Sequence, residues 1–292
     1  METHFQHIAL VGKYQSQSSR ELLASIAQLV TGLGAHVVIE AQSAIDAGLE
    51  KKFPSLSMEQ IGPQCDLVIV VGGDGTMLGV ARSLAAYNMP LVGINKGRLG
   101  FITDISPSAY EEALRQILSG NYTEDKRSMI SAQVWRQGEP IFSALALNEV
   151  VINRGSTSGM VDVSVEVNDH FVTNLWADGV IVSTPTGSTA YALSVGGPIL
   201  YPGIQGWILA PIAPHTLSNR PIVLPDDGIV TLELVAGRES SATFDTQSLA
   251  NLQLGDQVIL TAADQRVRFL HPLDWSYYET LRNKLRWYAG NN

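Results

Sequence analysis

An unbroken apolar run followed by a glycine-rich tetrapeptide restricts the fold of this chain more than any other feature. Leu67–Val71 is apolar at every position, which is typical of a parallel strand covered by helices on both faces. The sequence Gly-Gly-Asp-Gly at 72–75 follows at once, and a helical pattern runs from Met77 to Tyr87. Glycines allow close approach to the backbone, and N–H groups at a helix start can bind an anion. The segment therefore predicts a strand–loop–helix unit with a phosphate-binding loop.

Strand-like and helix-like segments alternate from residue 1 to about residue 125. Phe5–Gly12, His36–Glu40 and Leu91–Ile94 are further short apolar runs, and Ser108 with Glu111 predicts a capping box for a helix that ends near residue 120. This alternation predicts a doubly wound α/β domain over residues 1–125, whose ligands bind at the carboxyl ends of its strands.

The hydrophobic period then changes from 3.6 to 2, which predicts a mostly β domain over residues 126–270. Valines alternate with polar residues through Val161–Val167. Other strand-like runs are Ile130–Arg136, Phe142–Ile152, Gly179–Ser183, Pro221–Leu224, Ile229–Val235, Gln257–Leu260 and Arg266–Leu270. Residues 271–292 form a separate C-terminal segment.

Charge and composition exclude several classes of protein. The chain has 19 Lys and Arg against 28 Asp and Glu, so its net charge of −9 argues against a broad nucleic-acid or anionic-membrane surface. A single cysteine excludes a disulfide within the chain and a cysteine-based metal cluster, and the six histidines form no metal-ligand motif. There is no signal-peptide pattern and no apolar run long enough to span a bilayer, so we expect a cytoplasmic protein.

Asp74 has two possible roles. It can cap the helix that follows the glycines, or it can accept a hydroxyl proton during phosphoryl transfer. Three glycines around one acid exceed what a tight turn needs, and a carboxylate inside a phosphate site is electrostatically unfavourable. These two points favour a catalytic base.

The β-rich half contains a second candidate site. Thr186, Ser188 and Thr189 surround Gly187 and precede Tyr191, and such hydroxyls beside an aromatic ring suit a pocket for sugars and phosphates. Ser188 or Thr189 could instead cap a helix. Asn148-Glu149 is a polar pair within an apolar strand, which marks either a binding pair or a strand end.

Taken together, these segments resemble the bacterial NAD kinases. The resemblance covers nearly the whole chain, and the Asn-Glu pair combined with Thr184–Tyr191 is its most specific part. Other matching segments are Gly93–Asn95, Leu99–Phe101, Asp178-Gly179, Gly196–Pro198, Pro214–Ser218, Asp245 with Gln247, and Lys284–Trp287.

The resemblance implies transfer of the γ-phosphoryl group of ATP to the 2′-hydroxyl of the adenosine ribose of NAD, with Mg²⁺ or Mn²⁺ accompanying ATP. It implies that Asp74 is the base and that Gly72, Gly73 and Gly75 help to bind phosphate. It identifies no residue of this chain as a metal ligand. The NAD ligands that it implies are Asn148, Glu149, Asp178, Thr189, Ala190, Tyr191, Ser194 and Gln247. It also implies a homodimer or homotetramer, whose C-terminal segment returns to the N-terminal domain.

The Gly-Gly-Asp-Gly loop alone leaves other classes open. Diacylglycerol-type lipid kinases share it, and they are the main alternative, although this chain lacks an evident membrane-facing element. A non-catalytic nucleotide sensor is a second alternative, which the acid at position 74 disfavours. Phosphofructokinases share the loop too, but the β-rich second half departs from their repeated α/β domains.

Overall fold

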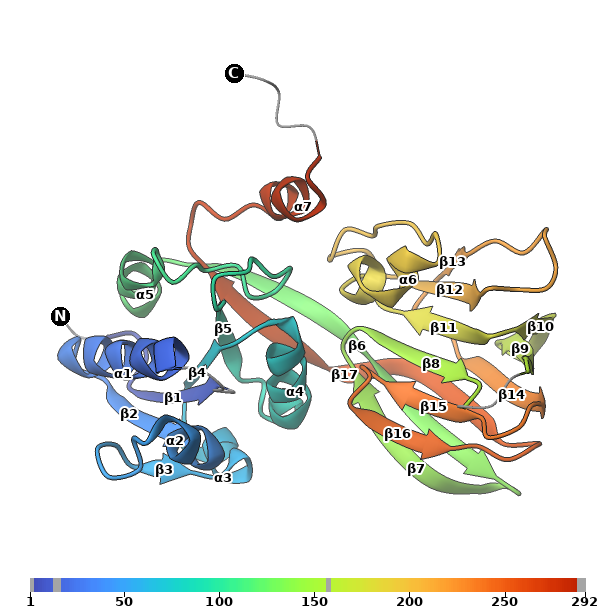
Figure 1. Cartoon of the computed structure of the whole chain (residues 1–292), viewed down its shortest axis with the longest axis horizontal. Helices are drawn as coiled ribbons and strands as arrows, with labels where there is room; N and C mark the ends of the chain where they lie inside the picture. The colour runs from blue at the N-terminus through green and yellow to red at the C-terminus, as the bar shows by residue number, and fades with distance from the viewer. Residues whose placement is uncertain (1–2, 13–16, 156–158, 288–292) are drawn as a thin grey trace. The chain divides into compact units, whose positions relative to one another are not determined.

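The computed structural model describes residues 3–12, 17–155 and 159–287, in two compact units (Figure 1). The first unit contains Met1–Lys126 and Val267–Asn292, and the second contains Arg127–Arg266. Two long strands, β6 (Thr123–Arg136) and β17 (Gln257–His271), run from one unit into the other along the chain.

The first unit is built on a parallel sheet in the order β3-β2-β1-β4-β5. All five residues of β4 are buried, as the apolar run predicted. The last part of β17 adds a parallel partner to β5. The strands are β1 (His7–Gly12), β2 (His36–Glu40), β3 (Ser55–Leu56), β4 (Leu67–Val71) and β5 (Pro90–Ile94).

Helices connect these strands, and residues from α1 and α5 pack with the sheet in one apolar core. The helices are α1 (Gln17–Gly32), α2 (Ala41–Ala47), α3 (Met58–Gln64), α4 (Asp74–Leu84), the short 3₁₀ helix η1 (Ala85–Tyr87), α5 (Tyr110–Leu118) and α7 (Tyr277–Leu285). The predicted capping box at Ser108 is wrong: α5 is preceded by Ala109, and the Ser108 hydroxyl lies 2.9 Å from that of Ser106.

The strand order places two connections side by side at one edge of the sheet. β4 and β5 are parallel neighbours, with Val71 opposite Ile94, so the residues that follow each strand emerge at the same end. Gly72 follows β4, and the segment 95–104 follows β5. Carboxyl ends of parallel strands are where α/β domains bind ligands.

The second unit is mostly β, as the change of period predicted, and its strands pair in antiparallel fashion. One sheet has the order β13-β12-β11-β8-β15-β16. A second set of hydrogen-bonded strands has the order β10-β9-β14-β17, and β6 pairs with both β17 and β7. The strands are β7 (Glu139–Ala146), β8 (Glu149–Asn153), β9 (Val161–Val167), β10 (His170–Ala177), β11 (Gly179–Ser183), β12 (Trp207–Ile212), β13 (Ile222–Leu224), β14 (Val230–Ala236), β15 (Ser241–Phe244) and β16 (Ser248–Asn251). The short helices η2 (Gly187–Thr189) and α6 (Tyr191–Ser194) follow β11.

Candidate active site

The glycine loop after β4 has open space beside two of its three glycines. The Gly72 N–H donates to the Ile94 carbonyl at 2.9 Å, so the sheet already uses this donor. A Cβ on Gly72 would meet the Thr76 side chain at 2.7 Å, whereas one on Gly73 or Gly75 would meet nothing within 4 Å. The backbone can therefore be approached at Gly73 and Gly75, beside the positive end of α4.

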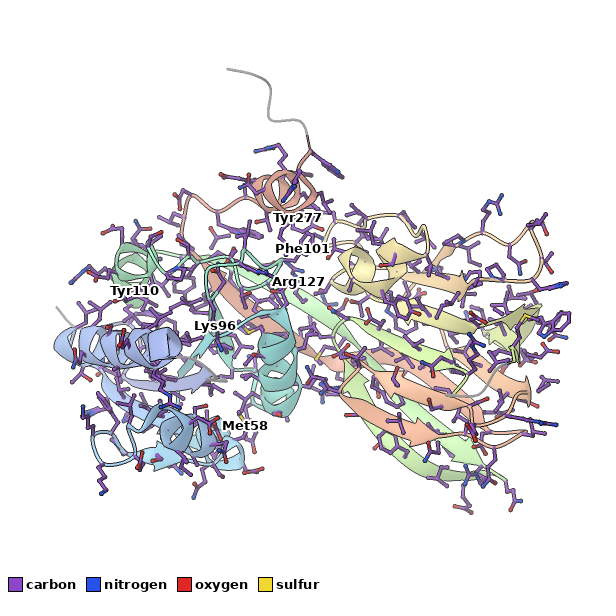
Figure 2. All side chains as sticks on the ribbon, viewed as in Figure 1. Met58, Lys96, Phe101, Tyr110, Arg127 and Tyr277 are labelled. Carbon is purple, nitrogen blue, oxygen red and sulfur yellow. The ribbon has the colours of Figure 1, made fainter. Side chains whose placement is uncertain are left out.

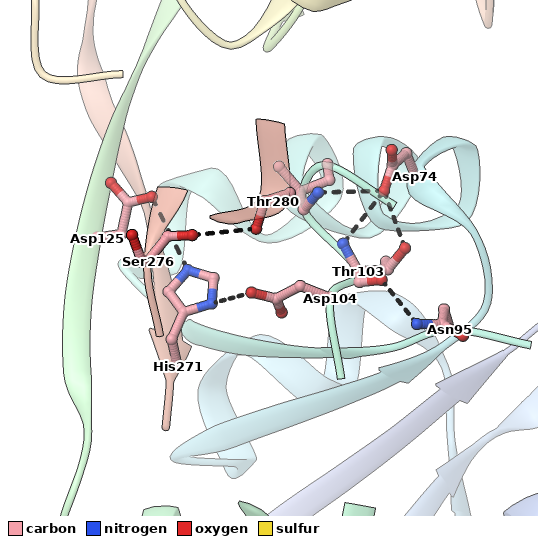
Figure 3. Close-up of polar contacts among 9 residues, drawn as sticks. Asp74, Asn95, Thr103, Asp104, Asp125, His271, Ser276 and Thr280 are labelled. Atoms are coloured by element: carbon pink, nitrogen blue, oxygen red, sulfur yellow. Dashed lines mark hydrogen bonds and ion pairs between the residues drawn. The ribbon is translucent and has the colours of Figure 1, made fainter. Parts of the chain in front are cut away.

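The Asp74 carboxylate does not cap its own helix. Gly73 is the N-cap residue, and no side chain caps α4. Asp74 instead accepts bonds from the segment after β5. Oδ2 accepts the Phe101 N–H at 2.8 Å. Oδ1 accepts the Ile102 N–H at 3.2 Å, and it also accepts the Thr103 N–H and the Thr103 hydroxyl at 3.1 and 2.9 Å, as Figure 3 shows for Thr103. Because a carboxylate oxygen has two lone pairs, Oδ2 keeps capacity for one further donor.

A second carboxylate in the other unit is held in a similar way. Asp245 is 1% exposed and accepts the backbone N–H groups of residues 147, 148 and 149 at 2.7–3.1 Å. It lies in the turn between β15 and β16, with φ of 51°. This turn fixes the backbone of Asn148 and Glu149, which sit where β8 begins.

Glu149 is a buried acid with a perturbed pKa. Glu149 is only 4% exposed, and its Oε2 atom has no hydrogen-bond partner among the described residues. Burial is the largest cause that raises the pKa of Glu149, to about 8, and the nearby charge of Asp245 adds to it, while the Tyr191 N–H opposes it. At neutral pH this side chain is therefore mostly a neutral acid, able to donate a hydrogen bond.

The hydroxyl-rich segment after β11 is partly structural. Thr184 Oγ1 donates to the Leu147 carbonyl, and Ser188 Oγ accepts the Leu200 N–H at 3.0 Å. A Cβ on Gly187 would overlap the Asn148 carbonyl, so the segment packs closely on the Asn-Glu pair. Neither Ser188 nor Thr189 is the N-cap residue of a helix, because Thr186 precedes η2 and Ala190 precedes α6.

The other predicted NAD ligands of this region are more accessible. Thr189 and Ala190 are half-buried, and Tyr191, Ser194 and Gln247 are exposed. The hydrogen bond from the Tyr191 backbone to the Glu149 carboxyl group places the start of α6 beside Glu149. Asn148, Glu149, Tyr191 and the turn with Asp245 thus form one polar group in the second unit.

Asp178 lies at the other end of the same strand pair. It precedes β11, where Gly179 pairs with Asn153, whereas Glu149 pairs with Ser183. At ~3.4 Å per residue, the two ends are about 14 Å apart. Asp178 forms an ion pair with Arg154, with Nε and Oδ1 3.4 Å apart. Within one chain, Asp178 therefore does not join the group around Glu149.

Three residues of these sites received no role from the sequence. Thr103 and the Asp245 carboxylate act through hydrogen bonds that link distant segments, which the sequence does not show; Asp245 belonged to a matching segment but received no role. Arg154 lies just past β8, and only its pairing across the strands reveals a cation beside Asp178.

The described residues contain no group of three His, Cys, Asp or Glu side chains placed to hold a metal ion. No helix in the described parts of the chain is long and apolar enough to cross a membrane.

Comparisons with known proteins place this chain in a family. Residues 8–122 match the family model for the ATP-NAD kinase N-terminal domain, and residues 147–272 match that for the C-terminal domain. The NAD kinase of Paracidovorax citrulli is 57% identical over 297 residues, which cover 99% of each chain. The chain belongs to the NAD kinase family.

Solved structures of NAD kinases agree with the fold described above. Yeast NADH kinase, complexed with NADH, has a TM-score of 0.90 at 20% identity, over 98% of this chain and 89% of that one. An NAD kinase from Archaeoglobus fulgidus in complex with ATP has a TM-score of 0.74 at 25% identity, over 96% and 98%. The predicted α/β and β-rich NAD kinase fold is confirmed, and the lipid-kinase alternative is not supported.

Proposed function

We propose that this protein transfers the γ-phosphoryl group of ATP to the 2′-hydroxyl of the adenosine ribose of NAD, yielding NADP and ADP. Membership of the NAD kinase family supports the reaction. The observation that carries its chemistry is the Asp74 carboxylate, fixed by four hydrogen bonds beside accessible glycine backbone and retaining acceptor capacity on Oδ2.

Asp74 Oδ2 is the proposed proton acceptor. The 2′-oxygen forms a bond to the γ-phosphorus, the bond from that phosphorus to the leaving ADP oxygen breaks, and the hydroxyl proton passes to Oδ2. Gly73 and Gly75 are the proposed phosphate contacts of the loop, since a Cβ on either would meet nothing within 4 Å, whereas a Cβ on Gly72 would meet the Thr76 side chain. Positioning and charge neutralisation supply the rest of the rate enhancement.

The proposed NAD ligands are the polar residues of the second unit. Asn148 and Glu149 form the centre of this set, with Glu149 donating from its neutral carboxyl group to a substrate oxygen. Thr189, Ala190, Tyr191, Ser194 and Gln247 surround them, and Asp178 is proposed as a more distant contact.

The divalent cation is proposed to enter with ATP as part of the substrate. The phosphate oxygens of ATP would hold the cation, which would neutralise charge on the transferred group. We further propose a cytoplasmic homodimer or homotetramer; the resemblance to bacterial NAD kinases supports this assembly, and light scattering of the purified protein tests it.

A coupled assay tests the proposed function. The protein is incubated with Mg²⁺, ATP and NAD, and the product is measured with an NADP-specific dehydrogenase. We expect NADP that accumulates only when both substrates are present. Parallel incubations with NADH or inorganic polyphosphate define the acceptor and the donor. Failure to form any NADP from ATP and NAD would overturn the proposal.

A further inference from the structure

The segment 99–104, which holds Asp74, is itself held by the C-terminal part of the chain. Its three consecutive N–H groups at Phe101, Ile102 and Thr103 bind the Asp74 carboxylate. The Asn95 side chain donates to the Thr103 carbonyl at 3.2 Å from within the same unit. The position of Asp74 therefore depends on how firmly this segment is fixed.

Lys284 fixes the beginning of the segment. Its Nζ donates to the Leu99 carbonyl at 2.7 Å and lies 5.2 Å from the ring centroid of Phe101, which is labelled in Figure 2. An ammonium group within about 6 Å of an aromatic ring is attracted to its face. The same Phe101 donates its N–H to Asp74 Oδ2, the oxygen with remaining acceptor capacity.

His271 fixes the end of the segment. Its Nδ1 lies 2.9 Å from Asp104 Oδ2, and its Nε2 lies 3.8 Å from Asp125 Oδ2 (Figure 3). The His271 ring stacks on Trp275 at 3.9 Å between centroids. Because Asp104 directly follows Thr103, the segment is held on both sides of its contacts with Asp74.

Lys284 contributes little to the docking of α7 itself. Tyr277, Thr280 and Leu281 are the buried residues that anchor this helix, whereas Lys284 is exposed in its last turn. Loss of the ammonium group therefore leaves the helix anchored and removes only the contacts with Leu99 and Phe101.

We propose that Lys284 is a positioning residue for phosphoryl transfer, which acts by fixing the Phe101 N–H that orients Asp74 Oδ2. This inference rests on the proposed role of Asp74 as the base. A small misplacement of a reacting group lowers the rate of the chemical step, whereas substrate contacts made elsewhere are unchanged. The effect is therefore expected in kcat and not in KM.

The test compares Lys284→Met, which keeps an apolar stem, with Lys284→Arg, which restores a donor and a cation. We expect Lys284→Met to lower kcat about tenfold with KM for ATP and NAD within about twofold of the parent. Lys284→Arg recovers most of this loss. Arg282→Met, which removes an exposed cation two residues earlier on α7, is the matched control and keeps the parent kcat.

A double-mutant cycle shows whether Lys284 acts through Asp74. In an Asp74→Asn background, Lys284→Met is expected to lower the residual rate by less than about twofold. Hydrogen exchange gives a direct structural readout: Lys284→Met speeds exchange of the amides of residues 101–103, while exchange in β1 and β4 stays at the parent rate.

Two results would overturn the inference: an unchanged kcat for Lys284→Met, or an equal tenfold loss in the Asp74→Asn background. Failure of the proposed function looks different. If Asp74→Asn turns over at the parent rate, Asp74 is not the base, whatever the behaviour of Lys284. If Asp74→Asn is nearly inactive and Lys284→Met is fully active, only the inference about Lys284 fails.

Discussion

Replacing Glu149 with glutamine is expected to make the protein more stable at alkaline pH. The pKa of Glu149 is raised from 4.5 to about 8, chiefly by burial and then by the charge of Asp245. The folded state therefore binds a proton that the unfolded chain releases, so the free energy of unfolding falls as pH rises from the unfolded pKa to the folded one. A glutamine side chain at this position cannot ionise, so the substitution removes this dependence.

The size of the effect follows from the two pKa values. One pKa unit corresponds to ~1.36 kcal/mol, so between about pH 5.5 and about pH 9 ionisation of Glu149 lowers the free energy of unfolding by about 3 kcal/mol. Glu149→Gln should match the parent protein near the acidic end of this range apart from a constant offset. The advantage of the variant then grows until pH passes the folded pKa.

Urea unfolding followed by tryptophan fluorescence measures this difference. Trp207 is fully buried in the same core cluster as Val150 of β8, so its emission reports on the unit that holds Glu149. Glu139→Gln, at an exposed position at the start of β7, is the matched control and should show no pH-dependent gain. A constant difference between Glu149→Gln and the parent across the range would show that the pKa of Glu149 is not raised in the folded protein.

Three further changes have defined outcomes. Gly100→Ala places a Cβ that overlaps Asp74 Oδ1 and Thr103 Oγ1, so kcat should fall at least about tenfold with NAD binding, measured by calorimetry, retained. His271→Gln should lower the melting temperature most below about pH 6.5. Burial lowers the pKa of His271, but the contacts with Asp104 and Asp125 outweigh burial and raise it. Protonated His271 therefore stabilises the folded state fully below the unfolded pKa, and this stabilisation is lost as pH rises through the folded pKa. A difference in melting temperature that grows with pH would contradict this sign. Asp245→Asn puts an amide donor against the backbone N–H groups, and should cost about 1–3 kcal/mol in urea unfolding; an unchanged midpoint would count against that role.

The sequence predicted regular elements well where burial and local pattern agree. Leu67–Val71 is apolar throughout and forms the fully buried β4, and the valines of β9 alternate with half-buried polar residues. In both segments the pattern of side chains reflects one dominant force, the removal of apolar surface from water.

Strand boundaries were wrong where polar residues belong to a strand. Gln257–Leu260 and Arg266–Leu270 were predicted as two separate strands, but β17 continues from Gln257 to His271. Its middle section is half-buried or exposed, so polar side chains there carry no desolvation cost. Conversely, the single run predicted at Phe142–Ile152 is two strands, because the backbone at Leu147 and Asn148 donates to Asp245.

The hairpin of β15 and β16 was missed for a related reason. Its turn places Asp245 and Thr246 at φ of 51° and 56° without a glycine, so it lacks the usual sequence signal. Tertiary hydrogen bonds to residues 147–149 stabilise this turn, and the sequence alone does not show them.

The candidate residues were easier to predict than their surroundings. Asp74 stood out because an acid among glycines is unusual, but its bonds to Phe101–Thr103 arise from the adjacency of β4 and β5. Its predicted catalytic role stays a prediction. The perturbed pKa of Glu149 likewise depends on burial beside Asp245, almost a hundred residues away.

The turnover of Asp74→Asn decides whether the Asp74 carboxylate is the base in phosphoryl transfer. The rate of NADP formation at saturating ATP and NAD is compared with that of the parent protein, with NAD binding and melting temperature measured on the same samples. We predict a kcat lower by about 10²–10⁴-fold with NAD still bound, since the amide cannot accept the 2′-hydroxyl proton. A folded Asp74→Asn protein that forms NADP at the parent rate would contradict the account.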